Sequence, residues 1–368
     1  MHRLTFYPIG NADCCFIELD NKQNILFDYA HYKKAEDNTD LRIDLKTIIS
    51  DKLVEKKKNY FDIVAFTHAD EDHINGFSDM FFLLHAKKYQ DENRVVINEL
   101  WVPAAIICES NLPEEAKILQ AEARYRLKNR KGIRIFSKPS MLKKWFESEK
   151  LKIEDYLDLM VDAGQFVPNY CLEKDDVEIF VHSPFAKRKD KEEIDRNTDA
   201  IVVQFTFQIN DKLTRLILSA DTPYDNWVDI VNITRAHKRP ERLNWDIYKL
   251  PHHCSYQSLS NEKGKEKTVP VEEVKWLLSQ GNQNSKIISS SDVIPNKDTD
   301  QPPHYQAANC YKEIIKTFEG EFLVTMEFPK KEKPEPLVIE IDEQGSTTIK
   351  RNIGAVGIIA NQPSHRAG

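Results

Sequence analysis

Long apolar runs and secretory features are absent from the sequence. No stretch of about 18 apolar residues occurs, which excludes a membrane-spanning helix. The first ten residues contain no apolar core of the kind found in secretory signals, so we expect a cytoplasmic protein. The six cysteines form no CxxC pair and show no regular spacing, and we therefore expect reduced thiols rather than a disulfide framework.

Net positive charge and glycine are also scarce. The formal net charge is −7, so the field of the whole molecule repels nucleic acid, and a phosphate-rich substrate would need local positive charge or metal. Only 11 of the 368 residues are glycine, which leaves few positions where a loop adopts positive φ at no cost. The chain is 40% hydrophobic and 30% charged, as in globular proteins with a substantial core.

The pattern of apolar residues predicts two β-rich halves around a helical segment. In the first half, strand-like runs lie at 4–9, 14–19, 24–28 and 62–67, and the last of these is apolar enough to be covered on both faces. Helical spacing dominates from about 105 to 163. Strand-like runs return at 177–183, 200–207, 213–220, 246–250, 286–291, 321–328 and 336–343. We predict a single α/β domain over 1–350 with a helical insertion at about 105–163, and a loose tail over 351–368.

Four side chains of metal-ligand type lie within six residues, directly after the run at 62–67. They are His68, Asp70, Asp72 and His73. Residues two apart in an extended segment project to one side, so His68 and Asp70 can share one ion. Asp72 and His73, at the turn into the next helix, can serve a second ion. The cluster taken alone also allows a purely structural interpretation, in which the carboxylates favour a helix start and the histidines are incidental.

Two later strand ends carry the same kinds of side chain. Asp221 ends the apolar run LTRLILSAD, where a carboxylate has no packing reason to be. His252 and His253 follow the run DIYKL. Three strand ends with ligand-type residues favour a metal site over the structural interpretation.

In order and spacing, these segments resemble the metallo-β-lactamase superfamily, and most closely the metallohydrolase domain of ComEC-type DNA-uptake proteins. The resemblance covers residues 1 to about 317. It is carried by IGNADC (9–14), LFDYA (26–30), THADEDHINGF (67–77), NTDAIVVQF (197–205), LSAD (218–221), HHCSYQS (252–258) and PPHYQAANCYKEI (302–314). The sequence departs from the family at Ala30, Ala220 and Cys254, where the family has glycine. The channel-forming helices of full ComEC proteins are absent, so DNA transport is not implied.

This resemblance implies an αββα sandwich of two mixed sheets with the helical insertion as an addition. It also implies two divalent ions, Zn²⁺ or Mn²⁺, and the carboxylate of Asp70 in place of a histidine favours Mn²⁺ without excluding Zn²⁺. The implied ligands are His68, Asp70, Asp72, His73, Asp221 and one or both of His252 and His253.

Other residues are expected to support the chemistry. The candidate catalytic residues are Asp72, His253 and His304, with His304 as general acid at the leaving group. A histidine of the pair 252–253 that is not a ligand is the alternative acid. Asp13 and Asp28 are expected to orient histidines. For His182, at the end of a predicted strand, we favour a packing or supporting role over metal binding.

The expected activity is hydrolysis of a phosphodiester, in a nucleic acid or a nucleotide, by a metal-activated water without a covalent intermediate. Basic residues at 128–134, 187–189 and 238–242 could hold phosphates, although acidic neighbours dilute each cluster. Two alternatives remain. The same site could hydrolyse an acyl or lactone bond, or the protein could be an effector or accessory subunit of a bacterial antiphage-type system that docks a partner on the helical insertion.

Overall fold

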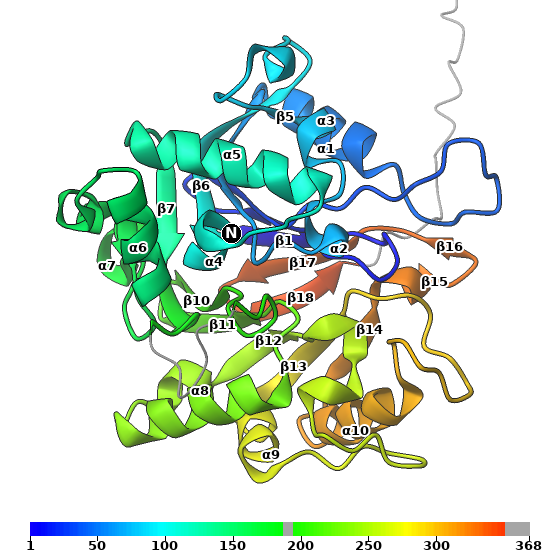
Figure 1. Ribbon diagram of the computed structural model, residues 1–368. Helices are drawn as coiled ribbons and strands as arrows, with labels where there is room; N and C mark the ends of the chain where they lie inside the picture. Colours follow the sequence, from blue (N-terminus) through cyan, green and yellow to red (C-terminus); the bar gives the residue numbers. More distant parts are fainter. Residues whose placement is uncertain (187–193, 350–368) are drawn as a thin grey trace, which may run out of the picture.

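Two β-sheets form the middle of the molecule, and helices cover both outer faces (Figure 1). The structure is a computed structural model and describes residues 1–186 and 194–349. The predicted loose tail and the basic cluster at 187–189 lie outside the described residues. The layered order of helices, sheet, sheet and helices is the αββα arrangement that the sequence predicts.

The larger sheet has an antiparallel half and a parallel half. Strands β18, β17, β1, β2 and β3 pair antiparallel, whereas β3, β4, β6, β7 and β8 run parallel. In spatial order the strands are β18 (Gly345–Ile349), β17 (Leu337–Asp342), β1 (His2–Phe6), β2 (Cys15–Glu18), β3 (Asn24–Phe27), β4 (Tyr60–Ala65), β6 (Val95–Pro103), β7 (Ile133–Phe136) and β8 (Met160–Val161), with β5 (Phe81–Phe82) paired to β6.

The smaller sheet is also mixed. Strands β9, β10 and β11 are antiparallel, and β11 to β14 are parallel. In spatial order they are β14 (Glu321–Val324), β13 (Gly281–Ser289), β12 (Trp245–Lys249), β11 (Lys212–Leu218), β10 (Val202–Ile209) and β9 (Val177–Ser183). A separate two-stranded sheet joins β15 (Pro329–Lys330) and β16 (Lys333–Pro334). Because β11 and β12 are parallel neighbours, the segments that follow them leave the sheet at the same edge.

Helices cover the outer face of each sheet (Figure 1). Those associated with the larger sheet and its loops are α1 (Leu45–Glu55), α2 (Glu71–Ile74), α3 (Phe77–Met80), α4 (Ala104–Cys108), α5 (Glu114–Lys128) and α6 (Ser140–Ser148). The short helix α7 (Leu172–Asp175) contacts β9 and β10 of the smaller sheet. Those on the smaller sheet are α8 (Tyr224–Ala236), α9 (Glu272–Leu278) and α10 (Tyr305–Lys316). Within the described residues, no helix is both long and apolar enough to cross a membrane.

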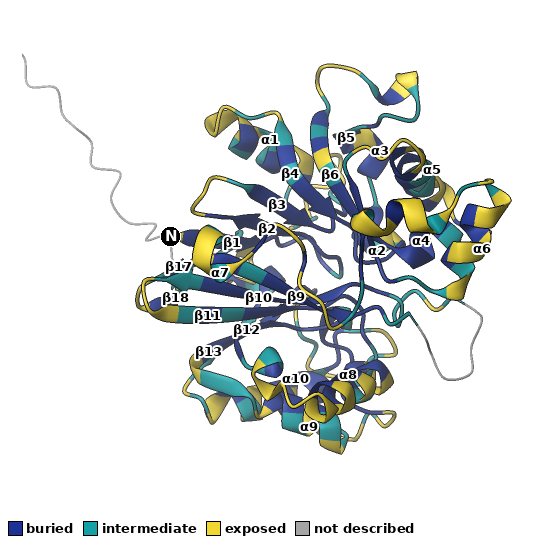
Figure 2. Cartoon of the chain, turned by 90° about the vertical axis from the view of Figure 1, so that its left-hand side faces the viewer, coloured by how far each residue is buried: buried dark blue, intermediate teal, exposed yellow. Residues whose placement is uncertain are grey.

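Three apolar clusters hold the four layers together. One lies between the larger sheet and its helices, one between the two sheets, and one between the smaller sheet and its helices. Strand β4 serves two of them, because Val64 packs toward the helices while Ile63 and Ala65 face the other sheet. Figure 2 shows the strands buried and the exposed residues concentrated on the outer helices and loops. The nearly continuous apolar run at 62–67 thus has the predicted cause.

The segment predicted as a helical insertion is only partly helical. It contains α4, α5, α6 and the 3₁₀ segment Ile153–Leu159, but also β7 and β8. These two strands pair in parallel and extend the larger sheet beyond β6. Four and two residues are too short for periodicity to separate a strand from a buried helix turn, so the sequence pattern does not reveal them.

Gly281 marks a close approach between parallel strands and supplies a test of this packing. A Cβ atom at Gly281 would lie 2.7 Å from the ring of Trp245 and 2.8 Å from the ring of Phe318. We expect Gly281→Ala to lower the free energy of unfolding by about 1–3 kcal/mol in urea denaturation, because overpacking forces the rings to move. The control is exposed Val269→Ala, expected to change it by less than about 0.5 kcal/mol. Equal stability of the two variants would contradict this packing.

Candidate metal centre

The turn that follows β4 is held by a carboxylate from the neighbouring strand. Asp28 comes directly after β3, and its two oxygens accept hydrogen bonds from the backbone nitrogen and the hydroxyl of Thr67, each at 2.7 Å. Asp28 Oδ2 also lies 2.8 Å from Nδ1 of His73. One side chain therefore fixes both the start of the turn and the orientation of its last histidine, as the sequence analysis expected of Asp28.

The acidic residues of this turn are not explained by helix capping. Asp70 occupies the N-cap position of α2, yet its side chain makes no capping hydrogen bond. Its carboxylate instead contacts His68 and Arg196. His68 and His73 are almost fully buried. Two buried histidines therefore lie beside a carboxylate that makes no capping hydrogen bond. This arrangement disfavours the purely structural interpretation of the cluster.

The second sheet supplies its residues from two adjacent strand ends. Asp221 follows β11, and His252 and His253 follow β12 in a single 3₁₀ turn (His252–Cys254). His252, His253 and Cys254 all have left-handed backbone, with φ of 49°, 51° and 67°. The planes of the two imidazoles differ by 79°, so the neighbouring rings face different directions. Only one of the two rings meets the residues of the first sheet closely.

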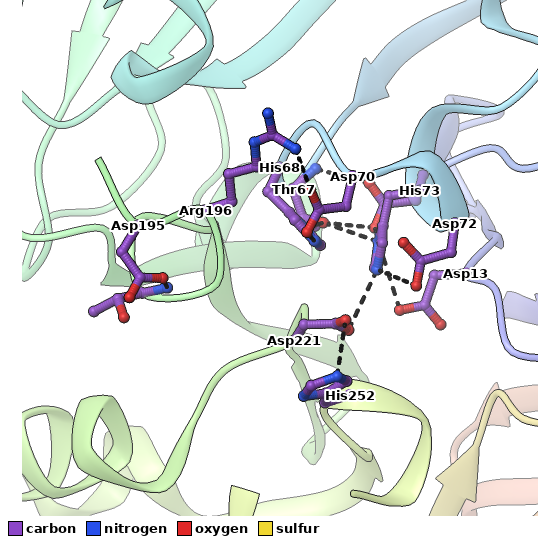
Figure 3. A network of polar contacts seen from close by, with 12 residues as sticks. Asp13, Thr67, His68, Asp70, Asp72, His73, Asp195, Arg196, Asp221 and His252 are labelled. Atoms are coloured by element: carbon purple, nitrogen blue, oxygen red, sulfur yellow. Dashed lines mark hydrogen bonds and ion pairs between the residues drawn. The ribbon is translucent and has the colours of Figure 1, made fainter. Parts of the chain in front are cut away.

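Four side chains from the two sheets converge on one point, and Figure 3 shows three of them, Asp72, His73 and Asp221. One ligand atom from each of Asp72, His73, Asp221 and His253 lies within 4.8 Å of the others. His73 Nε2 is 3.3 Å from Asp221 Oδ1 and 3.9 Å from Asp72 Oδ2. His253 Nε2 is 2.9 Å from Asp72 Oδ2 and 3.8 Å from Asp221 Oδ1. Each imidazole thus faces both carboxylates.

The hydrogen bonds behind the two imidazoles define which nitrogen carries the proton. His253 Nδ1 lies 2.7 Å from the carbonyl oxygen of Ser290, which can only accept. His73 Nδ1 faces the carboxylate of Asp28. Both Nδ1 atoms are therefore donors, and in the neutral imidazole the lone pair of Nε2 points at the carboxylates. The lone pair of each Nε2 and the carboxylate oxygen that it faces are both acceptors, 3.3 Å apart for His73 and Asp221 and 2.9 Å apart for His253 and Asp72. Such a pair needs a cation or an additional proton between its two atoms.

The charges of the four groups agree with this requirement. Burial favours the neutral imidazole of His73, but the surrounding carboxylates outweigh it and raise the pKa of His73 well above its usual value. The pKa of His253 is raised for the same reason, with Asp221 as its main partner. Burial would raise the pKa of Asp221, yet the imidazoles hold it well below its usual value.

The donor set fits a divalent cation. Two imidazole nitrogens and two carboxylate oxygens form a mixed nitrogen and oxygen site of the kind that Zn²⁺ and Mn²⁺ occupy. A cation between them would take the place of the protons that the raised pKa values place on Nε2 of His73 and His253. Asp72, His73, Asp221 and His253 are thus the sequence-predicted ligands that the structure brings together.

A second acidic group lies behind His73 and has its own counter-charge. Asp13, Asp28 and His73 also place ligand atoms within 4.8 Å of one another. The ammonium of Lys249 contacts the carboxylate of Asp13, and it also donates to the carbonyl of Ser219 at 3.1 Å. Because Lys249 already pairs with Asp13, and Asp28 already accepts from Thr67 and His73, we interpret this group as support for His73. Asp13 Oδ2 lies 3.8 Å from His73 Nδ1, close to the expected orienting position.

The remaining predicted ligands lie beside the four convergent groups. His68 Nε2 is 3.5 Å from Asp70 Oδ2, and neither belongs to a set of three or more donors among the described residues. His252 is partly exposed, and its Nε2 is 3.8 Å from Asp221 Oδ2. His304 precedes α10, with Nδ1 3.4 Å from the backbone nitrogen of Tyr256.

His182 is separate from the centre. It lies in β9 and faces a cavity of about 110 Å³ that is also lined by Phe180, Ile230 and Thr234. Its Nε2 has no hydrogen-bond partner among the described residues, and burial lowers its pKa to about 4. These surroundings agree with the packing role that the sequence analysis favoured.

Two contacting residues were missed by the sequence analysis. Lys249 lies in an apolar strand that leads to the histidine pair, and a lysine in such a run is a detectable signal of a buried carboxylate partner. Arg196 lies in a polar loop before β10, where arginine is ordinary and carries no signal. Both supply positive charge to carboxylates around the centre.

Comparisons with known proteins give likenesses of overall structure only. No family model matches the chain, and no curated protein matches it. Similar solved structures include a metal-dependent hydrolase of the beta-lactamase superfamily (TM-score 0.38, 10% identity, covering 93% of this chain and 100% of that chain). They also include the metallo-beta-lactamase GOB-18 from Elizabethkingia meningoseptica (0.31, 11%, 86% and 89%) and a diphosphatase from the PhnP family (0.30, 9%, 78% and 86%). Likenesses at this level say nothing about the reaction.

The buried pair of Lys249 and Asp13 can be tested by a double-mutant cycle. Lys249→Met leaves the Asp13 carboxylate buried without its partner, so we expect a loss of about 3–5 kcal/mol in the free energy of unfolding. The double variant Asp13→Asn, Lys249→Met should recover part of this loss. Urea denaturation after treatment with a chelator measures both, because bound metal no longer contributes. A loss below about 1 kcal/mol for Lys249→Met would show that the pair is not needed.

His182 predicts a dependence of stability on pH. Its pKa is about 4 in the folded protein, below the usual 6.5, so the folded state resists protonation. The resulting stability is complete above pH 6.5 and is lost as the pH falls toward 4, by up to about 3 kcal/mol. We expect His182→Gln to reduce the slope of unfolding free energy against pH in this window. Exposed His237→Gln, beside the same cavity, is the control and should keep the wild-type slope.

Proposed function

We propose that this protein is a metal-dependent hydrolase of the metallo-β-lactamase type that cleaves a phosphodiester. The observation that carries the proposal is the convergence of Asp72, His73, Asp221 and His253 from two sheets, with both Nε2 atoms directed at carboxylates. Residues 148 and 181 positions apart meet here at 3.3 Å or less, in a pattern that packing alone does not require.

Each of the four side chains has a defined task. His73 and His253 present Nε2 because Asp28 and the Ser290 carbonyl hold their Nδ1 protons. Asp221 is buried and lies between the imidazoles, whereas Asp72 is partly exposed. A bound divalent ion supplies a Lewis acid and lowers the pKa of a water molecule, which is the chemistry needed for direct hydrolysis.

His252 is the residue that we assign to protonation of the leaving group. It is partly exposed and adjoins the centre through Asp221, yet it lies outside the convergent set. His304, the first candidate from the sequence, has both ring nitrogens facing backbone groups, Nδ1 toward Tyr256 and Nε2 toward the Asp300 carbonyl at 3.4 Å. A partly exposed histidine such as His252 suits proton transfer better than one whose two ring nitrogens face backbone groups.

The proposed substrate class rests on the resemblance of the motifs to ComEC-type domains. The basic cluster at 128–134 adds little to it, because most of its side chains are paired with acidic residues. Lys128 pairs with Glu149, and Arg130 with Asp158. We therefore expect phosphate oxygens to be held mainly at the metal centre rather than by a basic surface, in agreement with the net charge of −7. Zn²⁺ and Mn²⁺ are the ions to test.

The proposal predicts activity that depends on the four ligands. Protein loaded with Zn²⁺ or Mn²⁺ should hydrolyse bis-p-nitrophenyl phosphate, and cyclic nucleotides or nucleic acids as natural analogues. We expect Asp72→Asn and His253→Gln to lower kcat/KM by more than about 100-fold, since even residues behind metal ligands contribute 10–100-fold. The control is Asp79→Asn, which alters an exposed aspartate of the nearby helix α3 and should keep wild-type activity.

The same assays separate the alternatives. Each variant is first checked by circular dichroism and thermal unfolding, so that a loss of activity is not a loss of fold. Hydrolysis of esters or lactones without any phosphodiester cleavage would reassign the substrate and keep the centre. Equal activity of wild type and Asp72→Asn on every substrate would overturn the proposal.

A further inference from the structure

We infer that the centre holds one divalent ion and that the guanidinium of Arg196 occupies the place where the sequence predicts a second. The inference rests on the proposed function, because it concerns the same centre. It departs from the pair of ions implied by the family resemblance. The residues concerned are His68 and Asp70 on the first sheet and Arg196 in the loop before β10.

Arg196 is bound on two sides by carboxylates, of which Figure 3 shows Asp70. Its Nη1 lies 2.5 Å from Oδ1 of Asp70. Its Nε lies 2.8 Å and 3.1 Å from the two oxygens of Glu109, and its Nη2 is 2.7 Å from Glu109 Oε1. Such a forked contact is among the strongest that arginine makes. Glu109 therefore holds the guanidinium in place independently of Asp70.

The donors left over are too few for a second ion. With Oδ1 of Asp70 bound to Arg196, the neighbouring donors are Oδ2 and His68 Nε2, 3.5 Å apart. Structural zinc sites use four protein ligands and catalytic sites three. In the described part of the chain, neither His68 nor Asp70 belongs to a set of three or more donors within 4.8 Å.

The charge of Arg196 also argues against a second ion. An ion at His68 and Asp70 would lie next to a permanent positive charge, and the two would repel each other strongly in a partly buried site. Displacing Arg196 would leave Glu109 without its forked partner. Asp70 therefore has its counter-charge already, whereas Asp72 and Asp221 face only imidazoles. We conclude that Asp70 pairs with Arg196 rather than binding metal.

The two aspartates allow a matched experiment. Wild type, Asp70→Asn and Asp72→Asn are stripped with a chelator, loaded with excess Zn²⁺, desalted and analysed for zinc per chain. Titration with Co²⁺, followed by its visible absorption, gives the dissociation constant. We expect one ion in wild type and in Asp70→Asn, with similar constants. Asp72→Asn should bind more than about 100-fold more weakly, because it removes a ligand rather than a supporting group.

The outcomes separate this inference from the proposed function. Two zinc ions in wild type, or loss of an ion in Asp70→Asn, would overturn the single-ion centre while leaving a metal hydrolase intact. No retained ion in wild type would instead remove the proposed function, and the inference with it. Circular dichroism of each variant shows whether a changed count follows from a changed fold.

Removal of the arginine tests the second half of the inference. Arg196→Ala leaves Asp70, Glu109 and His68 around an empty position, so we expect a second and weaker Co²⁺ binding step. The control is Arg3→Ala, which also removes one positive charge and leaves the carboxylate of Glu340 without its partner, far along the larger sheet. It should keep a single step. A single step in Arg196→Ala would show that the guanidinium is not what excludes a second ion.

Discussion

The contact between His73 and Asp221 joins the two sheets, and the rest of the centre depends on it. His73 comes from the turn after β4 in the larger sheet, and Asp221 follows β11 in the smaller one. Their ligand atoms meet at 3.3 Å only because the apolar layer between the sheets fixes the separation of the strands. Phe27 and Phe205 illustrate this layer, with ring centroids 5.7 Å apart across it. Short side chains such as those of His73 and Asp221 can then reach each other directly.

The sequence predicts the parts of this structure that repeat a local pattern. The run at 62–67 is apolar on both faces because both faces are covered, and the ligand-type residues at three strand ends mark the centre. The sequence does not reveal which residues meet. Whether His252 or His253 faces the first sheet depends on the direction of the rings in a left-handed turn, which no spacing encodes. Arg196 is equally hidden, because its partners Asp70 and Glu109 are distant in the chain.

The carboxylates around the centre have three kinds of counter-charge. Asp72 and Asp221 face imidazoles, Asp13 faces Lys249, and Asp70 faces Arg196. The guanidinium of Arg196 is a permanent cation, so Asp70 keeps its counter-charge whatever the solution contains. Imidazoles exchange protons for metal in the neutral range. On this arrangement, Asp72 and Asp221 are the carboxylates that can exchange their counter-charge for a metal ion. Asp13 and Asp70 are already paired with basic side chains.

The left-handed backbone at His252, His253 and Cys254 has a consequence for selectivity. Three successive non-glycine residues in this conformation cost about 1 kcal/mol each or more, so surrounding packing must impose the turn before any ion arrives. A ring mounted on such a rigid turn has little freedom left to lose on coordination. It also cannot move outward to suit a larger ion. We therefore expect the turn to discriminate between cations by radius. An ion that is too large should bind more weakly even when it is abundant.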